Sequence, residues 1–158
     1  MVAGRVLIGV GNEYRRDDGV GPALVAQVAG SVASDVVVSV VDGEPVALLD
    51  AWAGAELAVV VDAARCEPST PGRIHRRGAD EPIAARSAST HALGVAEALE
   101  LAAALGRAPT RLVIYTVEAA DLGHGAGLSP LVAAAVPALA RAVLADLGQD
   151  QRPGRAGP

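Results

Sequence analysis

The stretch RVLIGVGNEYRRDDGVG, residues 5–21, gives the clearest indication of the fold class. Its first six residues form a short apolar run that contains one glycine, which is typical of a buried strand. A glycine-containing loop follows, and then Val20, Leu24 and Val28 recur every four residues, as they would on one face of a helix. A strand that leads through a short loop into a helix predicts the start of a βαβ unit.

The same alternation of strands and helices continues along the chain. Apolar runs predict further strands at 36–41, 56–62 and 111–117, and helical patterns predict helices at 45–52, between Thr90 and Gly106, and at 130–147 after the N-cap Ser129. This alternation favours an α/β fold, a three-layer α/β/α sandwich with a mostly parallel sheet. The composition agrees, because 51% of the residues are hydrophobic and most of these are small or branched, which suits strands covered on both faces.

The length of 158 residues suits one compact domain. We expect residues 1–147 to form this domain and the polar, Pro/Gly-rich residues 148–158 to form a disordered tail. The segment 65–89 is rich in Pro, Gly, Arg and Ser and is too long for an ordinary connection. It predicts either a functional loop or an extra edge strand around residues 72–76.

The composition also excludes several classes of protein. All 13 basic residues are arginines, which excludes Schiff-base enzymes, Ser–Lys hydrolases and P-loop proteins, because each of these needs a lysine. A net charge of −5 argues against a nucleic-acid partner. The sequence shows neither an apolar run long enough for a membrane span nor a secretory leader, so we expect a cytoplasmic protein without a membrane partner.

Three residues that favour metal binding fall where a parallel sheet binds its ligands, beyond the carboxyl ends of the strands. Asp18 lies in the loop after the first strand, Asp62 ends the run LAVVVD, and His91 opens a helix after the long segment. A cationic imidazole is disfavoured at the positive end of a helix, so His91 should be neutral and able to ligate. Two carboxylates and one imidazole suit zinc, nickel or manganese, and they predict a divalent-metal site.

Each of these residues also has a purely structural interpretation. Asp17 and Asp18 would complement the dipole of the helix that follows them, and Asp62 could cap a turn. A lone histidine at a helix start is usually a surface residue. A nucleotide site in the first loop is a poor alternative, because Tyr14 stands where a dinucleotide-binding fingerprint needs its third glycine, and two acids would repel a pyrophosphate.

At these residues the sequence resembles the hydrogenase maturation endopeptidases, which process nickel–iron hydrogenases. The resemblance extends from Val6 to about Leu147. It rests on motifs that follow one another in the family's order, namely GVGN at 9–12, DDGVG at 17–21, VDA at 61–63, STHALG at 89–94 and GLSP at 127–130. The first two together are quite specific, and the others support the resemblance as a set.

The resemblance implies both a fold and a function. The fold is a twisted sheet of about five strands between helices. The activity is removal of a C-terminal peptide from the large-subunit precursor of a nickel–iron hydrogenase after nickel is installed. Asp18, Asp62 and His91 match the family's metal-binding positions, which implies that they contact nickel presented by the substrate, although zinc or another divalent ion could occupy the site. Where the family often has Asp-Gly-Gly, this chain has Asp42-Gly43-Glu44, which adds a carboxylate near the site.

Water is the nucleophile that the sequence favours. Cys66, the only cysteine, has no evident base beside it, and no serine occupies a strand–Ser–helix elbow. Water would attack a peptide carbonyl polarised by the metal, with Asp17 or Asp42 as the base. Asn12 could donate a hydrogen bond to the developing oxyanion, or it could simply hold its turn.

Two other functions remain open on the sequence alone. A peptidyl-tRNA-hydrolase-like enzyme would also open with a strand, Gly-Asn and a tyrosine, but it would carry a histidine where Asp17 and Asp18 stand. A non-catalytic, flavodoxin-like binding module would need phosphate-binding amides rather than acids that converge with a histidine. Neither remaining histidine is expected at the site, because His75 lies among arginines and should be exposed, and His124 should lie in a loop.

Overall fold

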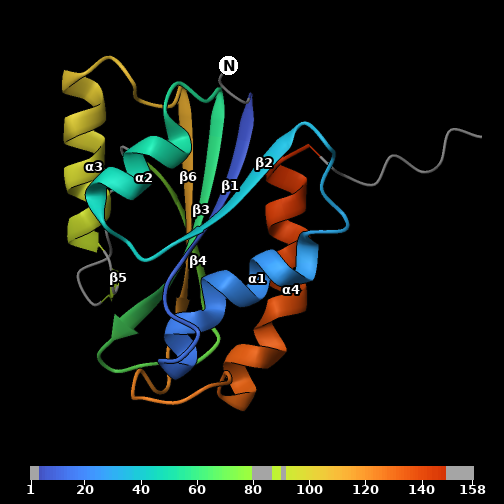
Figure 1. The fold of residues 1–158 in the computed structure, drawn as a ribbon. Helices are drawn as coiled ribbons and strands as arrows, with labels where there is room; N and C mark the ends of the chain where they lie inside the picture. Colours follow the sequence, from blue (N-terminus) through green and yellow to red (C-terminus); the bar gives the residue numbers. More distant parts are fainter. Residues whose placement is uncertain (1–3, 80–86, 90–91, 149–158) are drawn as a thin grey trace, which may run out of the picture.

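The chain folds in the predicted alternation of strands and helices (Figure 1). The computed structural model describes residues 4–79, 87–89 and 92–148. Thr90, His91 and the predicted tail beyond Gly148 lie outside the described residues. Among the residues that are described, no helix is long and apolar enough to cross a membrane. The elements are β1 (Arg5–Val10), the 3-10 helix η1 (Arg16–Gly19), α1 (Val20–Val28), β2 (Val36–Val41), α2 (Pro45–Trp52), β3 (Leu57–Cys66), β4 (Ile74–Gly78), β5 (Ser87–Ser89), α3 (Ala92–Ala104), β6 (Arg111–Glu118) and α4 (Pro130–Asp146).

The strands form one sheet in the order β2-β1-β3-β6-β4, and β5 pairs with the far end of β3. β1, β2, β3 and β6 are mutually parallel, whereas β4 is an antiparallel edge strand beside β6. The predicted sheet of about five mostly parallel strands is therefore confirmed. The extra edge strand expected near residues 72–76 is β4, whereas β5 has no counterpart in the sequence-based prediction.

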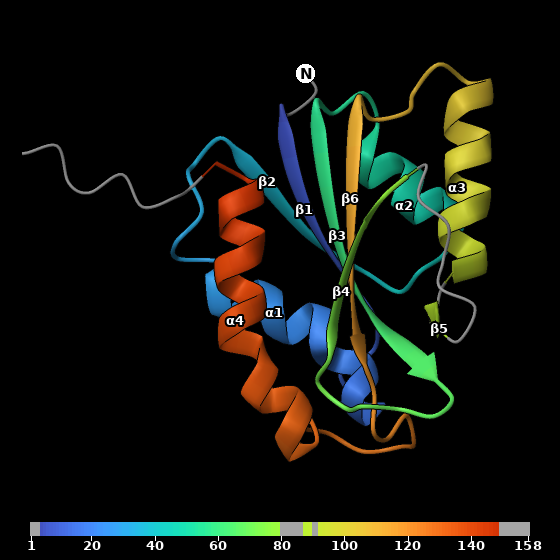
Figure 2. The same ribbon diagram turned by 180° about the vertical axis from the view of Figure 1, so that it is seen from behind.

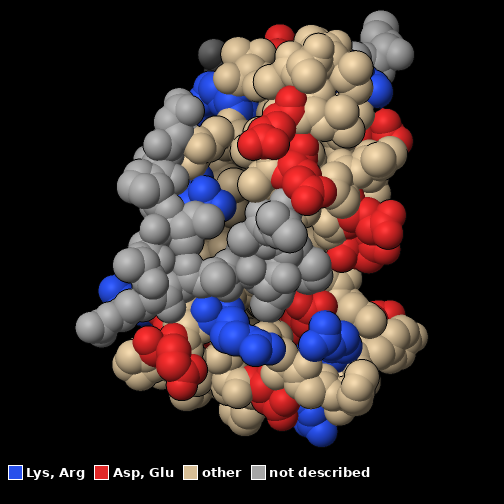
Figure 3. Space-filling view, turned by 90° about the vertical axis from the view of Figure 1, so that its left-hand side faces the viewer, with Lys and Arg blue, Asp and Glu red and all other residues tan. Residues whose placement is uncertain are grey.

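Helices cover both faces of the sheet, which confirms the three-layer sandwich (Figures 1 and 2). α1 and α4 pack on one face, and α2 and α3 pack on the other. Side chains alternate along β3 and supply both cores, with Val59 and Val61 on the α1–α4 side and Ala58 and Val60 on the α2–α3 side. On the outer surface over α2 and α3, the acidic and basic side chains of the described residues lie interspersed (Figure 3).

The largest difference from the predicted strand boundaries is at the end of β3. β3 does not end at Asp62 but continues to Cys66. The extra length stays in the sheet because β6 pairs with it as far as Ala64 opposite Glu118, and β5 pairs with it from the other side. β1 ends earlier, level with Asp62. Asp62 therefore lies where the neighbouring strand ends, although its own strand continues.

Candidate active site

Three chain segments meet at the carboxyl ends of β1, β2 and β3. The last residues of β1 and β2 pair, so the loops that leave these strands start side by side. Gly21 in α1 touches the ends of β1 and β3, because a Cβ there would lie 2.6 Å from the Val10 nitrogen and 2.7 Å from the Val61 carbonyl oxygen. Only glycine permits this close approach. It brings η1, which carries Asp18, into contact with β3, which carries Asp62.

Asp18 and Asp62 are both buried at this edge of the sheet. Asp18 is 2% exposed, and its Oδ2 accepts a hydrogen bond of 2.9 Å from the backbone N–H of Asn12. Asp62 is fully buried, and its Oδ1 accepts a hydrogen bond of 2.8 Å from the backbone N–H of Ala63. Burial of carboxylates costs free energy unless hydrogen bonds or a cation compensate it. Carboxylate oxygens are also ligands for divalent cations, which makes the two acids candidates for a metal contact.

Asp17 makes a different set of contacts from Asp18. It is fully buried, and its carboxylate accepts hydrogen bonds from the backbone N–H groups of Ala120 (2.8 Å), Asp121 (2.9 Å) and Ser129 (2.7 Å) and from the Ser129 hydroxyl (2.7 Å). Burial acts to raise the pKa of Asp17, but these hydrogen bonds outweigh it, so the pKa lies below its ordinary value. A carboxylate occupied in this way is better suited to join two loops than to take a proton as a general base.

Backbone hydrogen bonds strengthen this connection between the first loop and the loop after β6. The Arg16 N–H donates to the Gly125 carbonyl at 2.8 Å, and the Asp17 N–H donates to the Asp121 carbonyl at 3.0 Å. Ser129 holds the N-cap position of α4, as predicted, but its side chain makes no cap hydrogen bond because it donates to Asp17. The loop that carries Asp17 is thus fixed by a segment more than 100 residues away in the sequence.

Asn12 and Asp42, the other predicted catalytic groups, lie at the rim of this site. Both residues are exposed. Asn12 Oδ1 accepts a hydrogen bond from the Tyr14 N–H at 2.9 Å, and Asp42 Oδ1 accepts one from the Glu44 N–H at 3.1 Å. Such bonds are typical of Asx turns. Both residues therefore stabilise their own turns, and neither is buried as Asp18 and Asp62 are.

A surface pocket of about 530 Å³ opens beside these two residues. Its walls combine Asn12 and Asp42 with apolar surface from Tyr14, Val25 and Val40. Tyr14 is 66% exposed and Val40 is 51% exposed, so a large part of this apolar surface is accessible. An exposed apolar patch rimmed by polar groups is typical of a surface that binds another protein segment.

The structure corrects the predictions for His75 and Cys66. His75 is half-buried rather than exposed, and its Nε2 lies 2.8 Å from Glu118 Oε2. The buried Cys66 thiol hydrogen-bonds to the same carboxylate, so the expectation that no base lies beside it is wrong. Burial and the charge of Glu118 raise the pKa of the Cys66 thiol to about 11. The thiol is therefore protonated at neutral pH, which argues against Cys66 as the nucleophile.

Glu118 is a buried acid at this edge of the sheet that the sequence-based prediction does not include. It is 4% exposed and ends β6, at the same edge of the sheet as the predicted site. The strand-end rule that selects Asp62 would also select Glu118, because it follows the apolar run at 111–117 directly. His124, by contrast, is an exposed loop residue, as predicted.

His91, the third predicted metal ligand, lies outside the described residues, but the chain on either side of it is placed. Ser89 in β5 pairs with Ala64 of β3. Gly94 in α3 packs against Gly43, whose carbonyl oxygen would lie 2.1 Å from an added Cβ. Ala64 follows Asp62 on β3 by two residues, and Gly43 lies in the loop after β2. Both contacts are therefore made with segments of the predicted site.

Solved structures of known proteins resemble this chain over nearly its whole length. The hydrogenase maturating endopeptidase HybD from E. coli is 25% identical, with a TM-score of 0.76 and coverage of 92% of this chain and 93% of that one. The NiFe hydrogenase maturation protease HybD from Thermococcus kodakarensis is 26% identical, with a TM-score of 0.77 and coverage of 90% and 99%. An endopeptidase from Escherichia coli, solved in solution, is 25% identical, with a TM-score of 0.78 and coverage of 90% and 91%.

Sequence comparison points to the same group of proteins. A comparison with curated protein sequences gave no match. Residues 22–146, however, match the profile of the HycI family, described as hydrogenase maturation protease. This match covers most of the chain and favours neither a peptidyl-tRNA-hydrolase-like enzyme nor a flavodoxin-like binding module. The chain belongs to the hydrogenase maturation protease family.

Proposed function

We propose that this protein removes a C-terminal peptide from the nickel-loaded large subunit of a nickel–iron hydrogenase, and that Asp18, Asp62 and His91 contact that nickel. The observation that carries the proposal is the pair of buried carboxylates, Asp18 and Asp62, at the carboxyl edge of the sheet in a chain of this family. The similar HybD protein from Thermococcus kodakarensis is by name a NiFe hydrogenase maturation protease, which supports this class of substrate.

The charge of the site supports a dependence of cleavage on nickel. Carboxylate and imidazole groups can complete the coordination of a divalent ion that another molecule already holds. Without the cation, the docked precursor would bring no positive charge to these two buried acids. A precursor that carries nickel therefore offers an attraction that a nickel-free precursor lacks. The same chemistry would allow zinc or another divalent ion to bind at these residues.

Hydrolysis at this site uses water as the nucleophile. The substrate's nickel polarises the scissile carbonyl, and water attacks its carbon while a carboxylate accepts the proton that water loses. Asp42 at the rim is the better candidate for this base, because the oxygens of Asp17 are occupied by hydrogen bonds. The proton then passes to the leaving amine. The Asn12 amide is available as a donor to the oxyanion.

The pocket of about 530 Å³ beside Asn12 and Asp42 is suited to hold the residues that flank the scissile bond. Val40→Asp is expected to raise KM about tenfold with little change in kcat, because it removes apolar contact area that both ground and transition states use. Steady-state kinetics with the nickel-loaded precursor measure this effect. Val46→Asp is the matched control, because Val46 is 59% exposed and is not among the residues that line this pocket. Equal KM values for the two variants would contradict this placement of the peptide.

Incubation with a large-subunit precursor tests the proposed function. The C-terminal peptide should be released from the nickel-loaded precursor and not from the nickel-free one, as measured by mass spectrometry. Asp18→Asn should abolish release, whereas Asp50→Asn, an exposed acid on α2, should leave it unchanged. Equal cleavage of both precursors would reject the dependence on nickel. Absence of cleavage of either precursor would reject the proposed substrate.

A further inference from the structure

A second group of metal-ligating side chains lies at the far end of β3. Among the described residues, Cys66, His75 and Glu118 offer ligand atoms that all lie within 4.8 Å of one another. They come from three strands, since Cys66 ends β3, His75 lies in β4 and Glu118 ends β6. Asp62 precedes Cys66 by four residues on β3, which separates the two by about 13 Å along the strand. The cluster is therefore separate from Asp62.

The register of the sheet explains why these three residues meet. Side chains alternate between the faces of a strand, so residues two apart share a face. His75 pairs with Thr116, and Glu118 lies two residues beyond it on the same face. Ala64 pairs with Glu118, and Cys66 lies two residues beyond Ala64. The three side chains therefore project from one face of the sheet, at adjacent positions.

Hydrogen bonds hold the Glu118 carboxylate against Cys66 and His75. Its Oε1 accepts a hydrogen bond of 2.9 Å from the Thr70 N–H, and its Oε2 lies 2.8 Å from His75 Nε2. Arg73 Nε lies 3.9 Å from the same Oε2, but that side chain is 65% exposed. Burial acts to raise the pKa of Glu118, but hydrogen bonds from Thr70, His75 and Cys66 outweigh it and lower the pKa. An ionised carboxylate thus faces a thiol and an imidazole.

We infer that Cys66, His75 and Glu118 bind a zinc ion that joins β3, β4 and β6. Thiolate, imidazole and carboxylate are the three types of side chain that bind zinc in proteins. Tetrahedral zinc holds one sulfur and two N/O ligand atoms roughly 3.3–3.6 Å apart, so small side-chain adjustments within this cluster suffice. Three protein ligands leave a fourth position for water, which can enter on the side of His75, whose side chain is 30% exposed.

Zinc binding requires one proton to leave the cluster. The pKa of the Cys66 thiol is raised to about 11, so the ion must displace the thiol proton into solvent. The proton that His75 Nε2 donates to Glu118 must move to Nδ1 of the same ring by exchange with solvent. The lone pair of Nε2 is then free to ligate. Glu118 is already an acceptor. The net change is one zinc ion bound and one proton released for each site.

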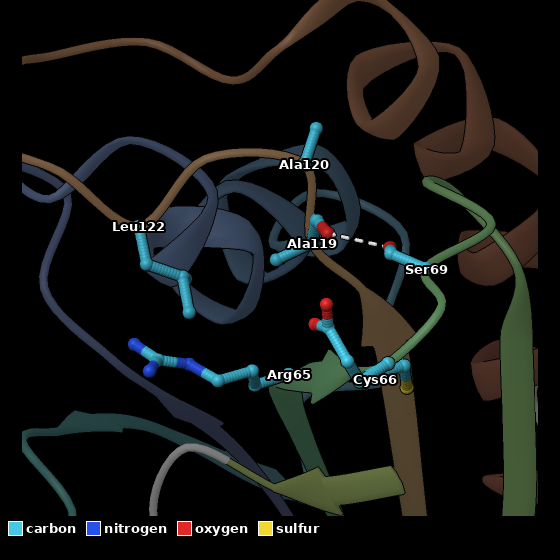
Figure 4. Close-up of a pocket in the computed structure, with 7 residues that line it drawn as sticks. Arg65, Cys66, Ser69, Ala119, Ala120 and Leu122 are labelled. Carbon is cyan, nitrogen blue, oxygen red and sulfur yellow. Dashed lines mark hydrogen bonds between the residues drawn. The ribbon is translucent and has the colours of Figure 1, made fainter. Parts of the chain in front are cut away.

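The proposed site would anchor the segment that leads from β3 into β4, for which the motifs shared with the family offer no counterpart. A cavity of about 310 Å³ lies beside this segment, with Arg65, Cys66, Ser69, Ala119 and Leu122 in its lining (Figure 4). The Ser69 hydroxyl closes one wall by donating to the Ala119 carbonyl at 2.8 Å. The Cys66 sulfur points away from Arg65 and Leu122 (Figure 4).

Titration of the Asp62→Ala variant with Co²⁺ and then Zn²⁺ tests the inference, because this variant lacks one of the proposed nickel contacts. One equivalent of Co²⁺ should produce a thiolate-to-cobalt charge-transfer absorption, and Zn²⁺ should remove it and raise the melting temperature. Adding Cys66→Ser should abolish the absorption and weaken zinc binding at least about 100-fold, since loss of an outer-shell partner alone costs 10–100-fold. Adding His124→Ala, which removes an exposed loop histidine, should change neither the absorption nor the zinc affinity.

Two outcomes of the cobalt titration would overturn the inference. One is the lack of a thiolate absorption at one equivalent of Co²⁺, and the other is an absorption that survives Cys66→Ser. His75→Gln provides a second variant that keeps the thiol and a side chain of similar size, and it should weaken zinc binding by a similar factor. Unchanged zinc affinity in this variant would also reject the three-ligand site. Cys66→Ser in the otherwise unaltered chain should still process the nickel-loaded precursor, so failure of the zinc site and failure of the peptidase role can be distinguished.

Discussion

Asp62→Asn is expected to reduce the rate of peptide release from the nickel-loaded precursor by at least about 100-fold. The substitution keeps the size of the side chain and an oxygen that can accept the hydrogen bond from the Ala63 N–H, now 2.8 Å long. It removes the negative charge that would face the substrate's nickel. The loss should therefore come from the metal contact rather than from the fold. Initial rates over a range of precursor concentrations measure the effect.

The control for this experiment is Asp50→Asn, which removes one carboxylate from the surface of α2. Both variants should have melting temperatures and circular-dichroism spectra close to those of the unaltered protein, and only Asp62→Asn should lose activity. Rates for Asp62→Asn within threefold of those of the unaltered protein would contradict the assignment of Asp62 as a metal contact. A large fall in the melting temperature of Asp62→Asn would contradict the claim that its effect is confined to the metal contact.

Asp17→Ala is expected to lower the free energy of unfolding by about 3–5 kcal/mol. The substitution removes the acceptor of the hydrogen bonds from the N–H groups of Ala120, Asp121 and Ser129 and from the Ser129 hydroxyl. Asp17 itself is fully buried. An unsatisfied buried donor costs about 1–3 kcal/mol, and some relaxation of the loop should offset part of the sum. Urea unfolding at neutral pH measures the change. Asp50→Ala, which removes an exposed acid, should cause a much smaller change in the free energy of unfolding.

The acid dependence of stability gives a second measure of Asp17. Its pKa in the folded protein is lowered, so its contribution is fully present above about pH 4, where an ordinary aspartate is ionised in the unfolded chain. The contribution declines as the pH falls from there to the lower pKa of the folded state. Asp17→Ala should therefore lose less stability than the unaltered protein between neutral pH and about pH 3. If the free energy of unfolding fell equally with pH in the two proteins, the result would contradict the stabilising role of the Asp17 carboxylate.

The fold and part of the site follow from patterns that are local in the sequence. Apolar runs, helical periodicity, Pro130 at a helix start and glycines in turns specify most strands and helices, because each depends mainly on nearby residues. The alternation of these elements then restricts the sheet to a mostly parallel one. Asp18 and Asp62 could be selected from the sequence because parallel strands direct the residues at their carboxyl ends toward one edge.

Local patterns in the chain therefore specify the α/β layers and the edge at which the acids lie, whereas contacts between distant segments specify which polar groups touch. Asp17 and Asp18 are adjacent in the chain, yet one is bound to the loop after β6 and the other to the first loop. Cys66, His75 and Glu118 come together only because an antiparallel edge strand pairs with β6 in one particular register. Register depends on contacts between segments that are far apart in the chain, and no local pattern of residues encodes those contacts.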